Sequence, residues 1–397
     1  MAAPQSLKRL HSLDALRAAM MLLGFVLHSG VSYVTHPVPE AWFYQDPQTS
    51  VAFDWVVFII HLFRMPTFFV MCGFFAAFLY DREGVAGFLS HRTRRVLLPL
   101  VVGWLILFPL IRAGFIFAQS GGGQDGFERA LAGLTSTPYA TPLLGHLWFL
   151  YFLFIFCVAA CAIVPVVERL PQALRSRLVA TFGSLAPGVA GCLACAVVSA
   201  VSMLPMSKPA LDTSLTFVPM ARVLLAYTVF FVFGWLLFLR QDVVTAFGRH
   251  PWRYCAAGLT ASVAYMVILV GRPFGEGWAL HGPAIIAGGL AMWLLIYGVT
   301  GLFVRYFEQP SPVQRYLSDA SYWMYLVHLP CVIWFQGAMA SWPVSPLVKF
   351  AITLSGVTLV TVLSYHYLVR ATPIGQFLNG RRFDRALPPL TPQSARA

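Results

Sequence analysis

The sequence predicts an all-α fold, a polytopic membrane helix bundle with about ten transmembrane helices and both termini in the cytoplasm. Composition is the first reason: 58% of the 397 residues are hydrophobic and 11% are charged, against about 25% charged residues in soluble domains. Apolar runs of about 17–25 residues, the length that crosses a bilayer, recur along the chain. Lys and Arg gather in alternate loops, as they do on the cytoplasmic side of inner-membrane proteins.

Each expected helix is an apolar run bounded by polar or charged residues. The ten runs cover residues 14–34, 53–80, 96–118, 143–168, 181–204, 219–239, 252–271, 283–304, 319–339 and 347–369. The longer runs favour tilted or partly interfacial helices. We expect residues 1–370 to form one integral-membrane domain and residues 371–397 to form a cytoplasmic, basic and partly disordered tail.

The formal net charge of +12 has two readings. It would suit nucleic acid, but no basic run is interleaved with aromatic residues, so we expect no nucleic-acid partner. The expected outer loops contain only Arg129, Lys208 and Arg272, and the other loop cations fall on the inner side. This asymmetry is typical of a multi-pass protein of the bacterial inner (cytoplasmic) membrane.

The first apolar run carries Arg17 and His28. A charged side chain at membrane depth costs at least about 2.5–3.5 kcal/mol, which marks these residues as functional candidates. They lie eleven residues apart, about 20° past three helical turns and about 16 Å along the axis. Gly24 lies on the same face and leaves room for another group. The run therefore predicts a polar stripe with a fixed cation at its inner end and a titratable imidazole at its outer end.

The second run adds three polar candidates. Asp54 and His61 are seven residues apart, about 20° short of two turns, and Arg64 lies near the same face. Asp54 would reach the level of His28 and is a candidate to orient that imidazole, although it would also suit a plain interfacial helix start. We expect His61 and Arg64 to face the interior of the bundle.

The outer loop between these runs contains Glu40, Trp42 and Asp46. Either carboxylate is an alternative to Asp54 as the partner of His28. On the inner side, Arg92, Arg94 and Arg95 form a cluster that would bind phosphates or anionic lipid. From the residues alone, lipid binding and topology are the favoured reading.

Two later stretches carry histidines. His146 opens the run GHLWFL, in which Trp148 follows, and this pair suits sugar binding or an interfacial belt. His328 lies near mid-membrane in SYWMYLVHLP and would bind substrate or serve as a structural hydrogen-bonding group. The Cys192-x-x-Cys195 pair lies among small apolar residues, so we read it as packing. No metal-ligand spacing is visible, and we expect no metal.

Together these stretches resemble the integral-membrane acyltransferase 3 family, from Leu13 to about Arg370. The most specific element is LDALR with Arg17, ten residues and then His28; FRMPTFFVMCGFFAAFLY, GHLWFLYFL and SYWMYLVHLP follow in order. Within the family, the chain looks most like the glucan biosynthesis protein C group, which is implicated in succinylating osmoregulated periplasmic glucans.

The resemblance implies transfer of an acyl group, succinyl or acetyl, from cytoplasmic acyl-coenzyme A to a hydroxyl of an extracytoplasmic carbohydrate such as a periplasmic glucan. It implies that His28 is essential, that Arg17 helps to hold the donor, and that Arg92, Arg94 and Arg95 meet the coenzyme's phosphates. Acyl-coenzyme A would be a co-substrate, with no tightly bound cofactor. The expected partners are the lipid bilayer, acyl-coenzyme A, the carbohydrate and the glucan-synthesis machinery.

We hypothesise that His28, oriented by Asp54, acts as general base on the acceptor hydroxyl. The expected donor-binding residues are Arg17, His61, Arg64, Arg92, Arg94 and Arg95; the expected acceptor-binding residues are Glu40, Trp42, His146, Trp148 and His328. An acyl-histidine intermediate stays open, as does the choice between Arg64 and Arg112 for a succinyl carboxylate. A transporter or flippase of a glycan or lipid-linked sugar is the alternative, and a structural subunit of an export complex is a third.

Overall fold

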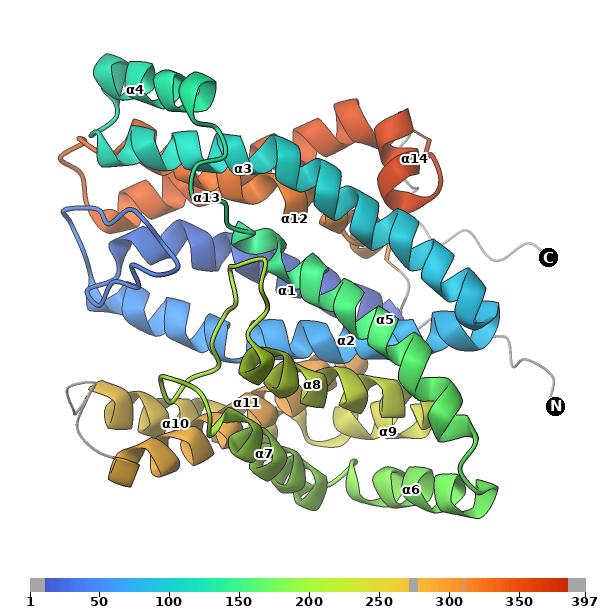
Figure 1. The fold of residues 1–397 in the computed structure, drawn as a ribbon. Coiled ribbons are helices and arrows are strands. Elements are labelled where there is room, and N and C mark those ends of the chain that lie inside the picture. Colours follow the sequence, from blue (N-terminus) through green and yellow to red (C-terminus); the bar gives the residue numbers. More distant parts are fainter. Residues whose placement is uncertain (1–10, 271–277, 310, 385–397) are drawn as a thin grey trace.

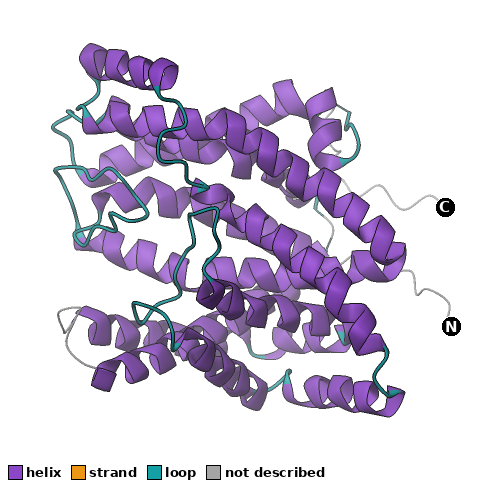
Figure 2. Cartoon of the chain, in the orientation of Figure 1, coloured by secondary structure: helices purple, strands orange, loops and turns teal. Residues whose placement is uncertain are grey.

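The computed structural model describes residues 11–270, 278–309 and 311–384, and among them every regular element is helical (Figure 2). The all-α prediction is confirmed. The α-helices are α1 His11–Gly30, α2 Val51–Arg92, α3 Leu98–Gln119, α4 Gly123–Ser136, α5 Trp148–Glu168, α6 Gln172–Leu185, α7 Val189–Met203, α8 Ala221–Leu239, α9 Gln241–Ala246, α10 Pro251–Val270, α11 Trp278–Tyr306, α12 Pro312–Ala338, α13 Pro346–Ser364 and α14 Pro373–Asn379. Short 3₁₀ or π turns join several of them, at Val31–Tyr33, Thr93–Leu97, Gly145–Leu147, Phe247–Arg249 and Tyr365–Val369.

Helix α1 lies in the middle of the bundle (Figure 1) and packs against α2, α11, α12 and α13. Its sequence explains this position, because apolar residues cover most of its circumference and twelve of its residues are buried. A helix that is apolar on all sides is stable only when other helices or lipid surround it. The polar side chains of α1 are therefore directed at neighbouring helices.

Helices α2 and α8 approach each other closely at two glycines. A Cβ atom on Gly73 would collide with the carbonyl of Phe231, and one on Gly234 would collide with the carbonyl of Val70. Small residues at such points let backbones touch, which is a common way to hold helices together in membranes. This contact joins the α1–α5 part of the bundle to the α7–α11 part.

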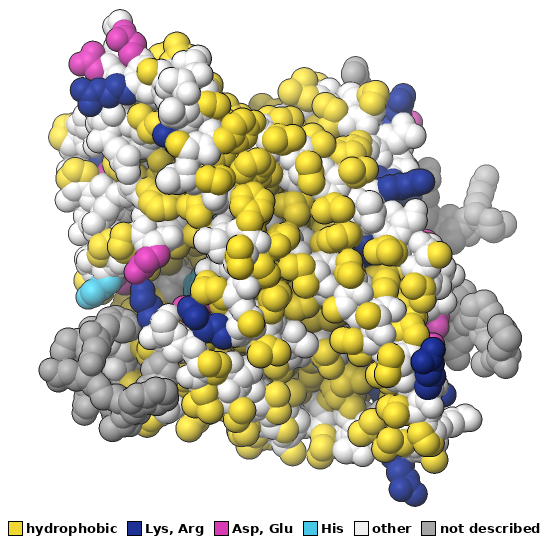
Figure 3. Space-filling view, in the orientation of Figure 1, with side chains coloured by type: hydrophobic (Ala, Val, Ile, Leu, Met, Phe, Trp, Pro, Cys, Tyr) yellow, Lys and Arg dark blue, Asp and Glu magenta, His cyan; other side chains and the backbone are white. Residues whose placement is uncertain are grey.

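Seven helical runs in the described residues are long and apolar enough to cross a membrane, or eight if the bent pair α6 and α7 forms one span. Figure 3 shows hydrophobic side chains over the middle of the visible face, with Lys and Arg near its edges. One run, Val51–Gln119, has 69 residues and would be about 100 Å long if straight. It contains α2 and α3, and α3 returns along the bundle (Figure 1).

Helix α12 is not among these runs, although the sequence predicts a span there. Its buried face carries Ser318, Ser321, His328 and Gln336, which lower its hydropathy. The helix nevertheless packs between α1, α3 and α13. The polar groups therefore face protein, which is where a bilayer-spanning helix must place them.

The segment predicted as a tail starts with ordered structure. Helix α14 is tied to the bundle by Asn379, whose side chain donates to the Asp319 carbonyl over 3.3 Å. Arg370 donates to the Asp384 carbonyl over 2.8 Å. The last part of the predicted tail, residues 385–397, lies outside the described residues, as does Arg272 of the expected outer loop.

Candidate active site

His28 lies in the last turn of α1, between two other rings. The indole of Trp42 stacks on one side with ring centroids 5.6 Å apart and planes 17° apart. The imidazole of His328 lies on another side at 5.3 Å. The Gln336 side chain donates to the carbonyls of His28 and Ser29 over 3.2 and 3.1 Å. These contacts fix the backbone and both neighbours of the predicted base.

Trp42 reaches His28 because the loop after α1 folds back over the helix end. Its Nε1 donates to Ser32 Oγ over 2.7 Å, and Ser32 Oγ donates in turn to Gln336 Oε1 over 2.9 Å. The indole also meets Phe115 edge-on at 5.3 Å. Trp42 is thus buried against His28, and its role as an acceptor contact stays a prediction.

A buried ion pair secures the same loop. Lys349 of α13 lies 2.7 Å from Asp46, and both side chains are 1% exposed. The hydroxyl of Tyr44 donates to Asp46 over 3.2 Å, and burial together with the Asp46 charge raises the pKa of Tyr44. A buried charge is tolerated only when it is paired and hydrogen-bonded. Asp46 is therefore an anchor for the loop, and the structure does not bring it to His28.

His146 and His328 form a second layer behind His28. Their rings are 5.3 Å apart, and they are 7% and 2% exposed. Nδ1 of His328 is 2.7 Å from the carbonyl of Tyr325, and Nε2 of His146 is 3.0 Å from the carbonyl of Leu326. The Tyr325 hydroxyl donates to the His146 carbonyl over 2.7 Å. The stretches GHLWFL and YLVHLP are thus joined directly.

Pro330 explains why the Leu326 carbonyl is free for His146. In a regular helix this carbonyl would accept from the N–H of residue 330, but proline has none. Burial of an unpaired carbonyl is costly, so another donor is needed. The imidazole of His146 supplies it.

Arg64 lies across α1 at Gly24, one turn before His28. A Cβ atom on Gly24 would collide with the guanidinium of Arg64, so the glycine makes room for the cation, as its place on the polar face predicts. Arg64 and His328 line a small, mostly apolar cavity with Met21, Phe68 and Phe149; Gly24, Met65 and Tyr325 complete it. The described side-chain bond of Arg64 is a weak one to Met65 Sδ at 3.3 Å.

Arg17 lies near the start of α1, at the opposite end of the polar stripe from His28. It donates to Ser318 Oγ of α12 over 2.5 Å, lies 3.6 Å from Asp14, and has its guanidinium carbon 6.0 Å from the centre of the Phe75 ring. Arg92 donates to the carbonyl of the same Phe75 over 3.2 Å. The structure therefore brings Arg17 and Arg92 to the same residue, Phe75.

The three inner arginines do not form a single cluster. Arg94 is exposed, and Arg95 donates to the carbonyls of Gln376 and Phe377 at the end of α14, over 2.8 and 2.5 Å. Cations are stabilised at helix C-termini by the unpaired carbonyls there. Of the three, Arg92 is the one that shares a contact residue, Phe75, with Arg17.

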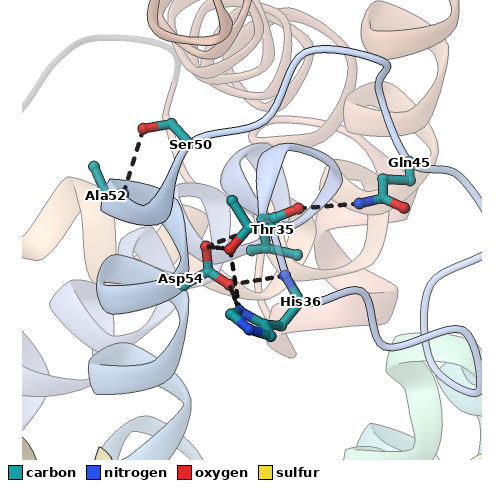
Figure 4. A network of polar contacts seen from close by, with 7 residues as sticks. Thr35, His36, Gln45, Ser50, Ala52 and Asp54 are labelled. Carbon is teal, nitrogen blue, oxygen red and sulfur yellow. Dashed lines mark hydrogen bonds and ion pairs between the residues drawn. The ribbon is translucent and has the colours of Figure 1, made fainter. Parts of the chain in front are cut away.

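The predicted partnership of Asp54 with His28 is not seen. Its carboxylate accepts from the backbone and hydroxyl of Thr35, both over 2.8 Å, and from the backbone of His36 over 3.0 Å, with the His36 ring also 3.0 Å away (Figure 4). Both carboxylate oxygens of Asp54 are therefore hydrogen-bonded to residues at the start of the loop after α1. An Asp in the first turn of a helix is well placed to bind such turn groups, which is the interfacial reading of this residue.

Of the remaining predicted residues, Glu40 and Trp148 contact other groups, and His61 is near enough to His28 to interact with it electrostatically. Glu40 is exposed and pairs with Lys208 at 3.2 Å, and its own backbone N–H and this ammonium lower the pKa of the Glu40 carboxyl. Trp148 is buried in an aromatic core with Phe69, Phe152 and Tyr227. His61 is exposed rather than enclosed. Glu40 is thus part of a surface ion pair, and Trp148 is a core residue.

Sequence reasoning missed Lys349, Gln336 and Ser32. Lys349 could have been found, because a lone Lys in the run PLVKFAITLSGV is expensive in a membrane unless it is paired. Gln336 and Ser32 carry no comparable signal, since neutral polar side chains are common at helix interfaces.

Known proteins resemble this chain over nearly its whole length. The family model "Acyltransferase domain" matches residues 10–366. "Glucans biosynthesis protein C" of Salmonella typhimurium is 27% identical over 376 residues, which are 93% of this chain and 94% of that protein. The proteins of that name from Salmonella typhi and Salmonella schwarzengrund are 26% identical over the same shares. No solved structure matches the chain. The chain is a multi-pass membrane protein and belongs to the acyltransferase 3 family.

Proposed function

We propose that this protein is an O-acyltransferase of the bacterial inner membrane. It transfers a succinyl or acetyl group from cytoplasmic acyl-coenzyme A to a hydroxyl of an extracytoplasmic carbohydrate, and a periplasmic glucan is the first candidate. The names of the relatives support the glucan as acceptor. Glucan-synthesis proteins are then the expected neighbours in the membrane.

The observation that carries the proposal is the polar column along α1. Arg17 at the inner end, Arg64 beside Gly24 and His28 at the outer end occupy one continuous side of the helix. The column covers about 16 Å, a length that an extended pantetheine arm can span. The donor would enter between Arg17 and Arg92, and its thioester would lie near Arg64.

In this arrangement His28 takes the proton of the acceptor hydroxyl as its oxygen attacks the thioester carbonyl. Arg64 donates to the oxygen of that carbonyl, where negative charge develops. Trp42 forms a flat wall of the kind that stacks on sugar rings. The coenzyme leaves as a thiol on the inner side.

The same proposal sets the topology. Counting α2 and α3 separately, adding α12, and taking α6 with α7 as one span gives ten crossings. Both termini then lie in the cytoplasm, and the ends that carry Arg92, Arg94 and Arg95 face the coenzyme. Arg residues on that side agree with the usual charge asymmetry.

The test is mass spectrometry of periplasmic glucans and envelope polysaccharides from cells with the native protein, with His28→Ala and without the gene. We expect an acyl mass increment only with the native protein. The size of the mass increment identifies the acyl group, and the polysaccharide that carries the increment identifies the acceptor. Equal masses in all three strains, combined with loss of glucan from the periplasm without the gene, would indicate transport instead.

A further inference from the structure

Two hydrogen bonds fix which nitrogens of His328 and His146 carry protons. A carbonyl oxygen only accepts, so Nδ1 of His328 donates to Tyr325 and Nε2 of His146 donates to Leu326. A neutral imidazole has one N–H and one lone pair. The lone pairs are therefore on Nε2 of His328 and Nδ1 of His146. Both atoms are buried without a hydrogen-bond partner among the described residues.

His328 cannot turn its lone pair away easily. Its ring stacks on Phe25 with centroids 5.1 Å apart and planes 17° apart, and His146 meets it edge-on. A buried nitrogen without a partner is costly, so a fixed one needs an explanation. The nearest titratable ring on the α1 side is His28, at 5.3 Å.

The described surroundings of His28 contain no carboxylate to balance a proton. Asp54 is bound to Thr35 and His36, Asp46 to Lys349, and Glu40 to Lys208. The cation of Arg64 lies one turn away and repels a second positive charge. A proton on His28 therefore has no counter-ion among these carboxylates, and the unpartnered lone pair on Nε2 of the neighbouring His328 is an available acceptor for it.

We infer that His328 is the proton acceptor for His28, in the place that a carboxylate takes in other His-dependent acyl transfers. This inference rests on the proposed function. The acceptor O–H proton passes to His28, and a proton of His28 passes to Nε2 of His328 while the new C–O bond forms. When the C–S bond breaks, the proton returns through His28 to the thiolate. No proton is lost or gained, and His146 keeps the receiving ring in place.

The test uses the full-length protein in detergent with acyl-coenzyme A and glucan. His328→Gln is expected to lower kcat by about 10²–10⁴-fold and to leave KM for both substrates within about threefold. His328→Asn is the second variant, because its amide can still donate to the Tyr325 carbonyl. His366→Gln is the matched control, since His366 lies in the Tyr365–Val369 turn after α13, against Tyr316, and we expect native rates from it.

A pH–rate profile separates proton transfer from a purely structural role. The titratable or charged groups that face His28 and His328 are Arg64, His61, His146 and Tyr325, and all four remain in the variants. We expect the dependence of kcat on pH to change shape in both His328 variants. A rise in KM at unchanged kcat, or a folded variant with more than a tenth of the native kcat, would overturn the inference.

This outcome is separable from failure of the proposed function. If the native protein transfers no acyl group from any acyl-coenzyme A, the function itself is wrong. If the native protein is active and the His328 variants match His366→Gln, the function stands and His328 is structural.

Discussion

The indole of Trp42 lies flat against the imidazole of His28, although the two residues belong to a loop and to a membrane-embedded helix. Their planes differ by 17° and their centroids are 5.6 Å apart. The stack fixes the ring of His28 from the outer side, while His328 contacts it from within the bundle. The loop therefore helps to set the orientation of the His28 imidazole.

Removing the indole should impair transfer more than folding. We expect Trp42→Ala to lower kcat/KM by about 10²-fold, the cost of losing the alignment of a reacting group. Trp42→Phe keeps a stacked ring and loses the bond to Ser32, so its loss should stay under about tenfold. Steady-state rates with purified protein test this order, and equal losses in both variants would contradict it.

The Asp46–Lys349 pair gives a stability prediction. Lys349→Met leaves Asp46 buried without its counter-ion, and breaking such a pair costs about 3–5 kcal/mol. The double variant Asp46→Asn with Lys349→Met should recover part of that loss, because no uncompensated charge remains. Thermal unfolding in detergent measures both. If the double variant is less stable than Lys349→Met, the pair does not act as a unit.

The sequence was informative where one helix carried the whole pattern. The shared face of Arg17 and His28 and the space at Gly24 follow from helical geometry, and the structure agrees. It was misleading where a loop intervenes: Asp54 lies at a suitable height, but Thr35 and His36 reach its oxygens first. Such local turns depend on the path of a loop, which no periodicity encodes.

Long-range polar contacts were equally hidden. Lys349 and Asp46 are separated by 303 residues and His146 and Leu326 by 180. Each is an ordinary residue in its own segment, and only the packing of α12 and α13 brings the partners together. The exposed position of Arg94 is, by contrast, a local effect, because side chains one residue apart on a helix point in different directions.

A side chain at Gly24 should displace the flexible end of Arg64 and so lower activity more than stability. Gly24→Ala places a methyl group where the Arg64 guanidinium lies, so the cation must move from the column. We expect a loss of transfer similar to that of Arg64→Met, about 10²–10³-fold for a donor to the developing oxyanion. The double variant Gly24→Ala with Arg64→Met should transfer no more slowly than either single variant. Additive losses of rate would show that the two residues act separately.

Arg17 gives a prediction for donor binding. Arg17→Met should raise KM for acyl-coenzyme A at least about tenfold, because a charge-assisted hydrogen bond contributes about 1.5–3 kcal/mol. Ser318→Ala removes only the hydroxyl that holds the guanidinium, so the effect should be a few-fold. The matched control is Arg169→Met, an exposed cation after α5. A similar rise in KM in this control would indicate a general charge effect.

We expect Pro330→Ala to raise the thermal stability of the protein and to lower its activity. Pro330→Ala supplies the missing N–H, which can then bond the Leu326 carbonyl within α12 and displace His146 from it. Proline is about 3 kcal/mol less favourable than alanine in a helix interior, so the variant should unfold at a higher temperature. Transfer should nevertheless fall by about tenfold or more, because His146 no longer holds the His328 ring behind His28.

Thermal unfolding and kcat of Pro330→Ala are measured on the same preparation. A variant with native activity would show that the tautomer of His146 is irrelevant, and one with lower stability would show that the break at Pro330 serves packing.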